Sequence, residues 1–471
     1  MSKNANHRRA SFGDYLAYGI YRVFESFLRL LPMEIVCLIG SAMGQITYFL
    51  MSDRRQVAIR NLRIVYGHSR SPQEIRALAR KTFRLSGLNL ISSISASTLS
   101  TEELLDRVEV EGRDHLINAK AQGNGCILLL AHMGNWELLT QLHILVPEIE
   151  ALASLYRPLN NPLLDRLIKR RRQRSGTQLF SKRDGFAKPI SHLKMKGTLG
   201  VIADQNAGKH GLPIPFFGKM SSMTYLPALL HRKTKAPIIP VSMCTLSPGK
   251  WKVVLHPAVK ISENDVKDTY QITNHSTIAY EKIMRKSPAD VLWMHNYWRI
   301  SKKTPLRLRG LTPRNADHVK NHVFKYFYVL IFVDKTIKDN QLTEILAYLH
   351  SCRHDLHISL AGPHGNFPNT DHCLKIDTQE PPHLASNSLR NREDSMPAPF
   401  DTAIDLSENG AGIDLFKQAN LPHIFSLSEP APSRNNNASI SSTDNYESHL
   451  KRFLNQVSPP PIKQQSNTQN S

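Results

Sequence analysis

The sequence is short of cysteine and of acidic residues. Its 471 residues include five cysteines without any C-x-x-C pair, which argues against a disulfide framework and a structural zinc site and fits a reducing compartment. Asp and Glu total 39 against 60 Lys and Arg, so the net charge is +21 and the expected partners are acidic. With 41% hydrophobic residues and a mean hydropathy of −0.33, wholesale disorder and a polytopic membrane protein are excluded.

One stretch near the N-terminus lacks charge altogether. Residues 35–52 are uncharged and mostly apolar, which is long enough for a helix to cross a hydrocarbon core. The basic cluster that follows, at 54–63, favours a cytoplasmic location for that end and is unlike the end of a signal peptide. Gly40 and Gly44 would also suit a buried core helix. We predict that residues 1–60 form a membrane-anchoring segment that either spans the bilayer or lies in its interface.

Apolar runs and helix signals alternate through the middle of the chain. Ser71, Pro72 and Glu74 form the start signal of a capped helix. Strands are predicted at 108–112, 125–131, 198–203 and 238–243, and helices at 136–145 and 225–234. This alternation predicts an α/β fold, a mixed sheet flanked by helices, over residues 61–303.

The segment AHMGNWE carries the clearest chemical signal. It begins at Ala131, where a buried strand turns into a helix. With Asn135 as N-cap, Glu137 in the first turn could reach back to the imidazole of His132 and orient it as a general base. No Ser or Cys nucleophile adjoins the pair, so His132 would deprotonate a substrate hydroxyl that attacks an acyl donor directly. A solvated histidine at a turn is the alternative.

A dense basic run follows at 157–196, where 12 Lys or Arg accompany only Asp165 and Asp184. Such a run is either a solvated helix face or a clamp for phosphate groups. Aromatic residues are scarce within it, so the base stacking typical of a nucleic-acid interface is not indicated.

These residues resemble a known family. AHMGNWE, SLYRPLNNPLLDRLI, RRQRSG, GTLGVIADQNAG, PFFGK, KAPIIPV and VLWMHNYWR stand in the order found in the bacterial lipid A biosynthesis acyltransferases, over about residues 10–303. The resemblance implies an inner-membrane enzyme with its catalytic domain facing the cytoplasm. It implies transfer of a lauroyl- or myristoyl-type chain from acyl carrier protein to a hydroxyl of a Kdo-bearing lipid A precursor, with no metal or bound cofactor and no nucleic-acid partner.

The resemblance also assigns roles to individual positions. His132 matches the family's general base and Glu137 its charge-relay carboxylate. Arg172 matches an arginine that grips phosphate, a part that falls to Arg174 if the alignment is shifted. Two further matches, Arg157 and Asp204, are assigned to substrate binding, Arg157 for the headgroup and Asp204 for the architecture of the site; a cap after the preceding strand is the alternative for Asp204.

The chain departs from the family after residue 303. Residues 304–380 form a short extension whose apolar runs predict a single βαβ unit, faintly similar to the start of a nucleotide-sugar glycosyltransferase. From 381 to 471, 40 of 91 residues are Ser, Asn, Gln or Pro, which predicts a disordered tail.

Three other functions stay open at this point. The same mechanism could act on another glycolipid acceptor, such as a mannosylated phosphoinositide. A non-catalytic membrane-associated scaffold would explain the charge but not the His132–Glu137 pattern. A nucleic-acid-binding protein would leave the N-terminal apolar segment unexplained.

Overall fold

A computed structural model describes residues 10–67, 69–298, 327–333, 337, 339–352, 356–362, 372–375, 402–407 and 424–426. These residues divide into two compact units. The first contains 1–58, 76–205 and 223–295, and the second contains 59–75, 206–222 and 296–471. Each unit is described by itself below.

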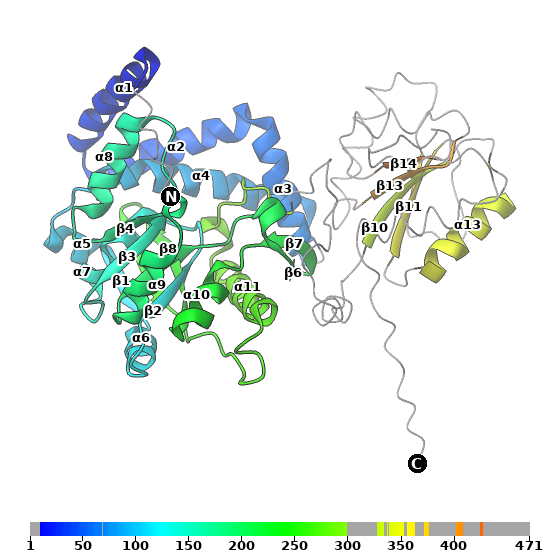
Figure 1. The fold of residues 1–471 in the computed structure, drawn as a ribbon. Coiled ribbons are helices and arrows are strands. Elements are labelled where there is room, and N and C mark those ends of the chain that lie inside the picture. Colours follow the sequence, from blue (N-terminus) through cyan, green and yellow to red (C-terminus); the bar gives the residue numbers. More distant parts are fainter. Residues whose placement is uncertain are drawn as a thin grey trace. The chain divides into compact units, whose positions relative to one another are not determined.

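A seven-stranded sheet forms the centre of the first unit (Figure 1). Its spatial order is β1-β9-β8-β2-β5-β3-β4. The strands are β1 (Val108–Glu111), β2 (Cys126–Leu130), β3 (Leu152–Tyr156), β4 (Gln178–Ser181), β5 (Thr198–Ile202), β8 (Ile238–Ser247) and β9 (Lys250–Leu255). Neighbouring strands run parallel except β8 and β9, which are antiparallel. The sheet is therefore mixed, as the alternating sequence pattern predicts.

Helices cover this sheet and confirm the predicted α/β class. They comprise α4 (Pro72–Ala96), α5 (Thr101–Arg107), α6 (Arg113–Lys120), α7 (Leu142–Leu145), α8 (Pro162–Gln173), α9 (Ala187–Lys194), α10 (Leu226–Thr234) and α11 (Thr269–Lys286), with short 3₁₀ turns η1 (Trp136–Gln141), η2 (Lys182–Asp184) and η4 (Pro288–Asp290). At the start of α4, the backbone N–H of Ser71 donates to Glu74 at 2.7 Å and the N–H of Glu74 donates to the Ser71 hydroxyl at 3.3 Å. The predicted capping box is thus confirmed.

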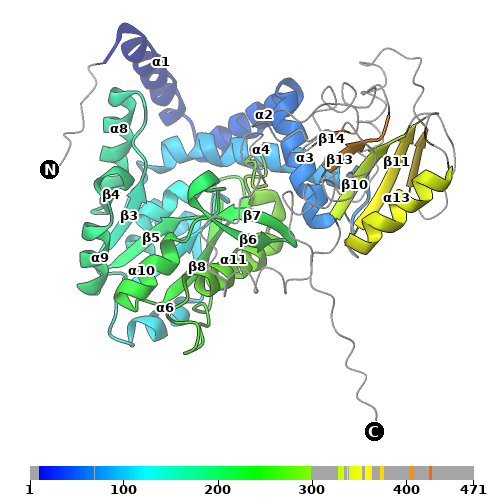
Figure 2. The same ribbon diagram turned by 45° about the vertical axis from the view of Figure 1, so that its right-hand side comes forward.

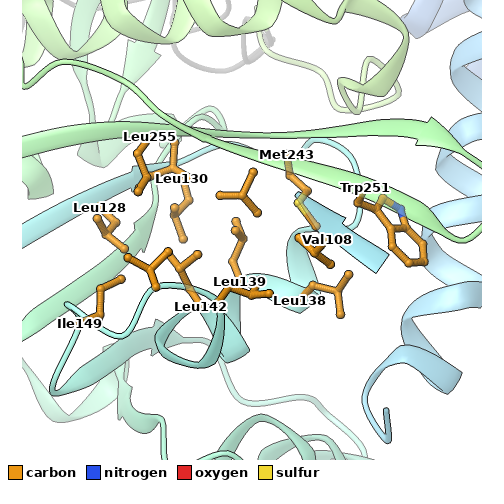
Figure 3. Close-up of a cluster of buried hydrophobic side chains, with 14 of the residues drawn as sticks. Val108, Leu128, Leu130, Leu138, Leu139, Leu142, Ile149, Met243, Trp251 and Leu255 are labelled. Carbon is orange, nitrogen blue, oxygen red and sulfur yellow. The ribbon is translucent and has the colours of Figure 1, made fainter. Parts of the chain in front are cut away.

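The central strand β2 is buried along its whole length, which explains its unbroken apolar sequence CILLL. One face of the sheet packs into a large hydrophobic cluster in which Leu128, Leu139 and Trp251 lie together (Figure 3). Cys126 is a fully buried member of this cluster, as expected for a small strand residue. The cluster makes the carboxyl end of β2 a rigid platform for the turn that follows it.

Two N-terminal helices, α1 (Phe12–Arg29) and α2 (Met33–Leu50), lie along one edge of the unit with α4 (Figures 1 and 2). Within the described residues, α2 is the one helix long and apolar enough to cross a membrane, and 33% of that segment is buried in the protein. Its buried side crosses α4 closely, because a Cβ on Gly44 would stand 2.2 Å from the carbonyl oxygen of Phe83. The glycines that favoured a core helix therefore mark a helix crossing on one face of α2.

The second unit contains a five-stranded parallel sheet of order β12-β11-β10-β13-β14. Its elements are β10 (Phe327–Phe332), α13 (Asp339–Cys352), β11 (Leu356–Gly362), β12 (His372–Lys375), β13 (Thr402–Asp405) and β14 (Ile424–Ser426). The strands β10 and β11 pair in parallel register, with α13 between them along the chain, as the predicted βαβ unit requires. The expectation of a short remnant is corrected, because three more strands complete the sheet and Ile331, Leu346 and Ile404 share a core.

Two of those strands, β13 and β14, fall within 381–471, where a disordered tail was predicted. The prediction is wrong for these residues because short apolar runs such as TAID are buried by parallel pairing with β10, a long-range contact that local composition does not reveal. Apart from Leu406 and Ser407, the rest of the predicted tail lies outside the described residues.

The second unit also contains the hairpin strand β6 (Leu212–Phe216), which pairs with β7 (Lys219–Met223). The Trp298 indole donates to the carbonyl oxygen of Phe216 at 3.2 Å, and their rings stack with centroids 5.5 Å apart. The hydroxyl of Ser221 donates to the carbonyl oxygen of Tyr297 at 2.7 Å. Two motifs far apart in sequence, PFFGK and VLWMHNYWR, thus form one aromatic cluster.

Candidate active site

Strand register brings His132 and Asp204 together. Leu130 of β2 pairs with Ile202 of β5 in a parallel ladder. The residues two positions beyond each partner therefore leave the sheet side by side at its carboxyl edge. Asp204 is fully buried and its two carboxylate oxygens accept from His132, Oδ1 from Nδ1 at 2.7 Å and Oδ2 from the backbone N–H at 3.0 Å.

The turn that holds His132 depends on the residues after it. Gly134 has a φ of +56°, and a Cβ there would stand 2.3 Å from the carbonyl oxygen of Met243. Its N–H donates to the carbonyl oxygen of Asp290 at 3.0 Å, and the carbonyl oxygen of His132 accepts from the N–H of Leu292 at 2.9 Å. Glycine is thus required at the sharpest point of the turn.

The environment of His132 suits a base. Burial alone would lower the pKa of the imidazole, but the charge and hydrogen bond of Asp204 outweigh burial and the pKa is raised. Burial likewise opposes ionisation of Asp204, yet the contacts with His132 hold the pKa of that carboxyl below its usual value. Because Nδ1–H donates to the carboxylate, the lone pair resides on Nε2, and the side chain remains 21% exposed. Gln205 Nε2 lies 3.4 Å from that nitrogen.

Glu137 has a different partner from the one expected. Arg172 of α8 donates to it twice, from Nε at 2.9 Å and from Nη2 at 2.6 Å, whereas Nδ1 of His132 is bonded to Asp204. No hydrogen bond joins Glu137 to His132 in the part of the chain that the structure describes. The expected reach of Glu137 back to the imidazole is therefore not observed, because the 3₁₀ turn η1 directs its carboxylate toward α8.

Neighbouring residues also differ from expectation in detail. Asn135 occupies the N-cap position of η1 without capping it, and its amide Nδ2 donates to the hydroxyl of Ser92 at 3.3 Å. The predicted helix at 136–145 begins as a 3₁₀ turn and continues as α7. Trp136 packs its ring edge-on to the His132 imidazole, with centroids 5.4 Å apart.

A cavity of about 500 Å³ adjoins Glu137 and Arg172. Its polar lining includes these two residues and Arg157, which follows β3. The apolar wall is contributed by α1, α4, η1 and α8, with side chains Phe24, Ile91, Ile94, Leu138 and Ile168. The volume and mixed lining are those of a site for a small amphiphilic ligand.

The remaining predicted residues separate into two groups. Arg157 lines the cavity, is exposed, and forms no ion pair within the described residues. Arg172 lines the cavity, whereas Arg174 is exposed at the end of α8 and is not among the cavity's lining residues. Asp204, which the resemblance matched to the architecture of the site, is fully buried beneath His132 and accepts the hydrogen bond of its Nδ1.

Sequence reasoning did not single out Lys182 or His295. Partial burial and the nearby charge of Arg157 lower the pKa of Lys182, and its charge in turn acts on His132. Burial lowers the pKa of His295, with Asp204 opposing that shift. Lys182 is one of 12 basic residues at 157–196, and nothing in the sequence distinguishes it from the others. His295 lies in the VLWMHNYWR motif, which served only to identify the resemblance. Among the described residues, no group of three or more His, Cys, Asp or Glu could hold a metal ion.

A buried carboxylate thus holds the His132 imidazole, and Glu137, five residues further on, lines an amphiphilic cavity together with the exposed Arg157. The family model for bacterial lipid A biosynthesis acyltransferases matches residues 7–300. The chain belongs to this family.

Characterised relatives carry related names. The chain is 28% identical to a lipid A biosynthesis acyltransferase of Haemophilus influenzae over 43% of its own length and 63% of the relative's. It is 25% identical to the lipid A biosynthesis lauroyltransferase of Escherichia coli, over 57% of this chain and 87% of that protein. A phosphatidylinositol mannoside acyltransferase of Mycobacterium tuberculosis is 27% identical over 41% of this chain and 60% of the relative.

Proposed function

We propose that this protein transfers a fatty acyl chain from acyl carrier protein to a hydroxyl of a Kdo-bearing lipid A precursor. The observation that carries the proposal is the pair formed by His132 and the buried Asp204, with Glu137, five residues beyond His132, lining an amphiphilic cavity. Family membership supports the reaction class. The thioester of the carrier protein supplies the acyl group, and no metal or bound cofactor takes part.

The proposed reaction needs one base and no enzyme nucleophile. Nε2 of His132 removes the proton of the acceptor hydroxyl, and the oxygen attacks the thioester carbonyl carbon. The tetrahedral intermediate collapses by breaking the carbon–sulfur bond, and the imidazolium returns its proton to the leaving thiolate. Asp204 stabilises the imidazolium and keeps Nε2 directed toward the substrate, the role that Glu137 was expected to play.

The cations around the site suit the charges of this acceptor. Arg157 and Lys182 lie close enough for their charges to interact, and Arg157 is exposed. Two cations held near each other favour binding of a phosphate group. The ion pair of Glu137 with Arg172 holds the guanidinium in the lining of the cavity. The acyl chain then lies against the apolar lining residues, among them Phe24 and Ile94.

We also propose attachment to the inner membrane with the site on the cytoplasmic side. Support comes from the apolar side chains that α1 and α2 leave exposed, among them Phe12, Val23 and Phe49. The basic residues Arg54 and Arg55 immediately after α2 favour the cytoplasmic side for that end.

The experiment is transfer of a labelled lauroyl or myristoyl group from acyl carrier protein to the Kdo-bearing precursor by membranes containing the protein. We expect label on the precursor with wild type, and a loss on the order of 10² to 10⁴ in rate for His132→Ala. His275→Ala, which changes a partly exposed histidine on α11, serves as the matched control and should retain the rate.

Two outcomes would redirect the proposal. Label transferred only to a mannosylated phosphoinositide would identify another glycolipid acceptor, as the name of the mycobacterial relative suggests. Equal transfer by wild type and His132→Ala would contradict the proposed base, whereas absence of transfer to either acceptor by folded, membrane-bound protein would favour the non-catalytic scaffold.

A further inference from the structure

A row of cations lies on α4, away from the candidate active site. Arg76, Arg80 and Arg84 are spaced four residues apart and therefore share one helix face, and Lys81 adjoins them. All four side chains are exposed. Within the described residues none of them forms an ion pair with an acidic side chain.

Contacts with α2 hold part of this row in place. Arg80 donates from Nε to the side-chain oxygen of Gln45 at 2.8 Å, and Arg84 donates from Nε to the hydroxyl of Ser41 at 3.3 Å. Both bonds use the inner nitrogen of the guanidinium, and the described residues provide no hydrogen-bond acceptor for the two outer Nη groups. The arginines are thus oriented by the protein and keep donors for a ligand.

The row borders a cavity of about 910 Å³ between α2, α4 and the turn that joins β8 to β9. Its apolar lining includes Leu38, Leu85 and Leu246. Asp290 is the one carboxylate among the described lining residues; burial raises its pKa, and it accepts hydrogen bonds from Ser287 and Thr245. The cavity therefore has a cationic border and an apolar wall, which suits an amphiphile with an anionic head.

The same edge of the unit exposes an unusual amount of apolar surface. On α2, Leu38 lines the cavity and is 56% exposed. Further exposed side chains on α2 are Ile35, Met43, Ile46, Phe49 and Leu50, and those on α1 are Phe12, Leu16, Ile20, Val23 and Phe27. Figures 1 and 2 both show α1 and α2 along the edge of the unit. The surfaces of soluble monomeric proteins rarely carry as many neighbouring exposed apolar side chains as α1 and α2 do.

Because α2 crosses α4 closely, only one face of α2 carries the exposed apolar side chains. Gly40 and Gly44 bring the backbone of α2 against that of α4, where no side chain or lipid could intervene. One face of α2 is thus packed in protein while the opposite face is apolar and exposed, an arrangement typical of a helix lying in a membrane interface. Cations beside such a face would stand at the level of the lipid phosphates.

We propose that the cavity bordered by Arg76, Arg80 and Arg84 binds the phosphate headgroup of an anionic phospholipid, while the exposed apolar face of α2 enters the same leaflet. The inference rests on the proposed membrane attachment and adds a lipid site separate from the candidate active site. A lipid is favoured over an acidic protein because the cations border a concavity with an apolar wall that continues onto α2.

The test measures partition of the full-length chain onto phosphatidylcholine vesicles with and without phosphatidylglycerol. Wild type should prefer the anionic vesicles. Arg76→Gln/Arg80→Gln/Arg84→Gln should lose roughly fivefold of this preference per charge, or about 100-fold in all. The control Lys188→Gln/Lys194→Gln/Lys233→Gln removes three exposed charges from α9 and α10. It should change the preference for anionic vesicles far less.

A second variant separates the cavity from general charge and from misfolding. Ala77→Trp keeps every charge and fills the cavity from an exposed position on α4, so it should also reduce the preference. A preference retained by both the triple variant and Ala77→Trp would overturn the proposal.

The remaining outcomes have distinct meanings. Equal wild-type binding to both vesicles would overturn the headgroup site and leave membrane attachment standing, whereas binding to neither would overturn both. Stabilisation by inorganic phosphate without a preference for phosphatidylglycerol would show a free-phosphate site. Loss of acyl carrier protein binding in the triple variant with its lipid preference intact would show a protein-docking surface.

Discussion

Arg172 holds Glu137 through two parallel hydrogen bonds of 2.9 and 2.6 Å. The preceding residue on α8, Arg171, contacts the buried carboxylate of Glu25 and the hydroxyl of Tyr21, both on α1. The two neighbouring arginines of α8 thus contact different elements. Arg172 contacts Glu137 at the candidate active site, and Arg171 contacts α1. Asn161 adds to this connection, because it caps α8 and donates to the carbonyl oxygen of Asp14 at 3.0 Å.

The two arginines matched to the family's phosphate-gripping position should differ sharply on substitution. Arg172→Ala removes a half-buried guanidinium from the cavity, and we expect kcat/KM for acyl transfer to fall about 10- to 100-fold. Arg174→Ala is the matched control on the same helix and should stay within about twofold, because that side chain is exposed and outside the cavity. The reverse order in steady-state kinetics would show that the alignment is shifted.

Removing the charge of Asp204 should change the pH dependence as well as the rate. The pKa of His132 is raised in the protein, so the active neutral imidazole is lost as the pH falls through that raised value. Asp204→Asn removes the charge that raises the pKa, and the acidic limb of the kcat/KM profile should move to lower pH. The rate itself should fall by about 10² to 10⁴, because the imidazolium loses its carboxylate partner.

Asp268→Asn is the control for this measurement. Asp268 caps α11, and asparagine caps helices equally well, so the substitution removes a carboxylate without removing a cap. Its pH profile should match wild type. An unshifted acidic limb in Asp204→Asn would contradict the assignment of His132 as the titrating base.

The crossing of α2 with α4 predicts opposite effects for two glycines. Gly44→Ala would place a methyl 2.2 Å from the carbonyl oxygen of Phe83, and overpacking against backbone should lower the free energy of unfolding by about 1–3 kcal/mol. Gly19→Ala in α1 meets nothing within 4 Å and should be neutral or raise it by about 0.5–1 kcal/mol. Thermal unfolding in one detergent compares the two, and equal midpoints would mean that α2 does not pack on α4 in this way.

Truncation after residue 310 should preserve transfer within about threefold. His132, Arg172 and Asp204 lie in the first unit, and the hydrophobic core of the C-terminal sheet is built from residues 329–406. The cut also retains Trp298 and its contacts with the β6–β7 hairpin. The activity assay on membranes tests this expectation. A truncated chain that is folded and membrane-bound but inactive would assign the extension a part in the reaction.

Local sequence was enough for much of the fold. The capping box at Ser71, the all-apolar strand β2 and the βαβ unit around α13 each depend on side chains near one another in the chain, and all three are confirmed. Strands β13 and β14 were missed because a short strand in a polar segment is recognised only by its partner.

The family, the α/β class and the position of His132 at the end of a buried strand could all be predicted from the amino-acid sequence, because motif order and apolar periodicity are local properties of the chain. The partner of His132 could not, because it depends on how the strands pair. Glu137 is five residues away and Asp204 is 72, yet parallel pairing of β2 with β5 places Asp204 against Nδ1 while η1 turns Glu137 toward Arg172. Residues far apart in the sequence come into contact because two strands pair in a particular register. The spacing of residues within one segment does not reveal which strand will be the partner.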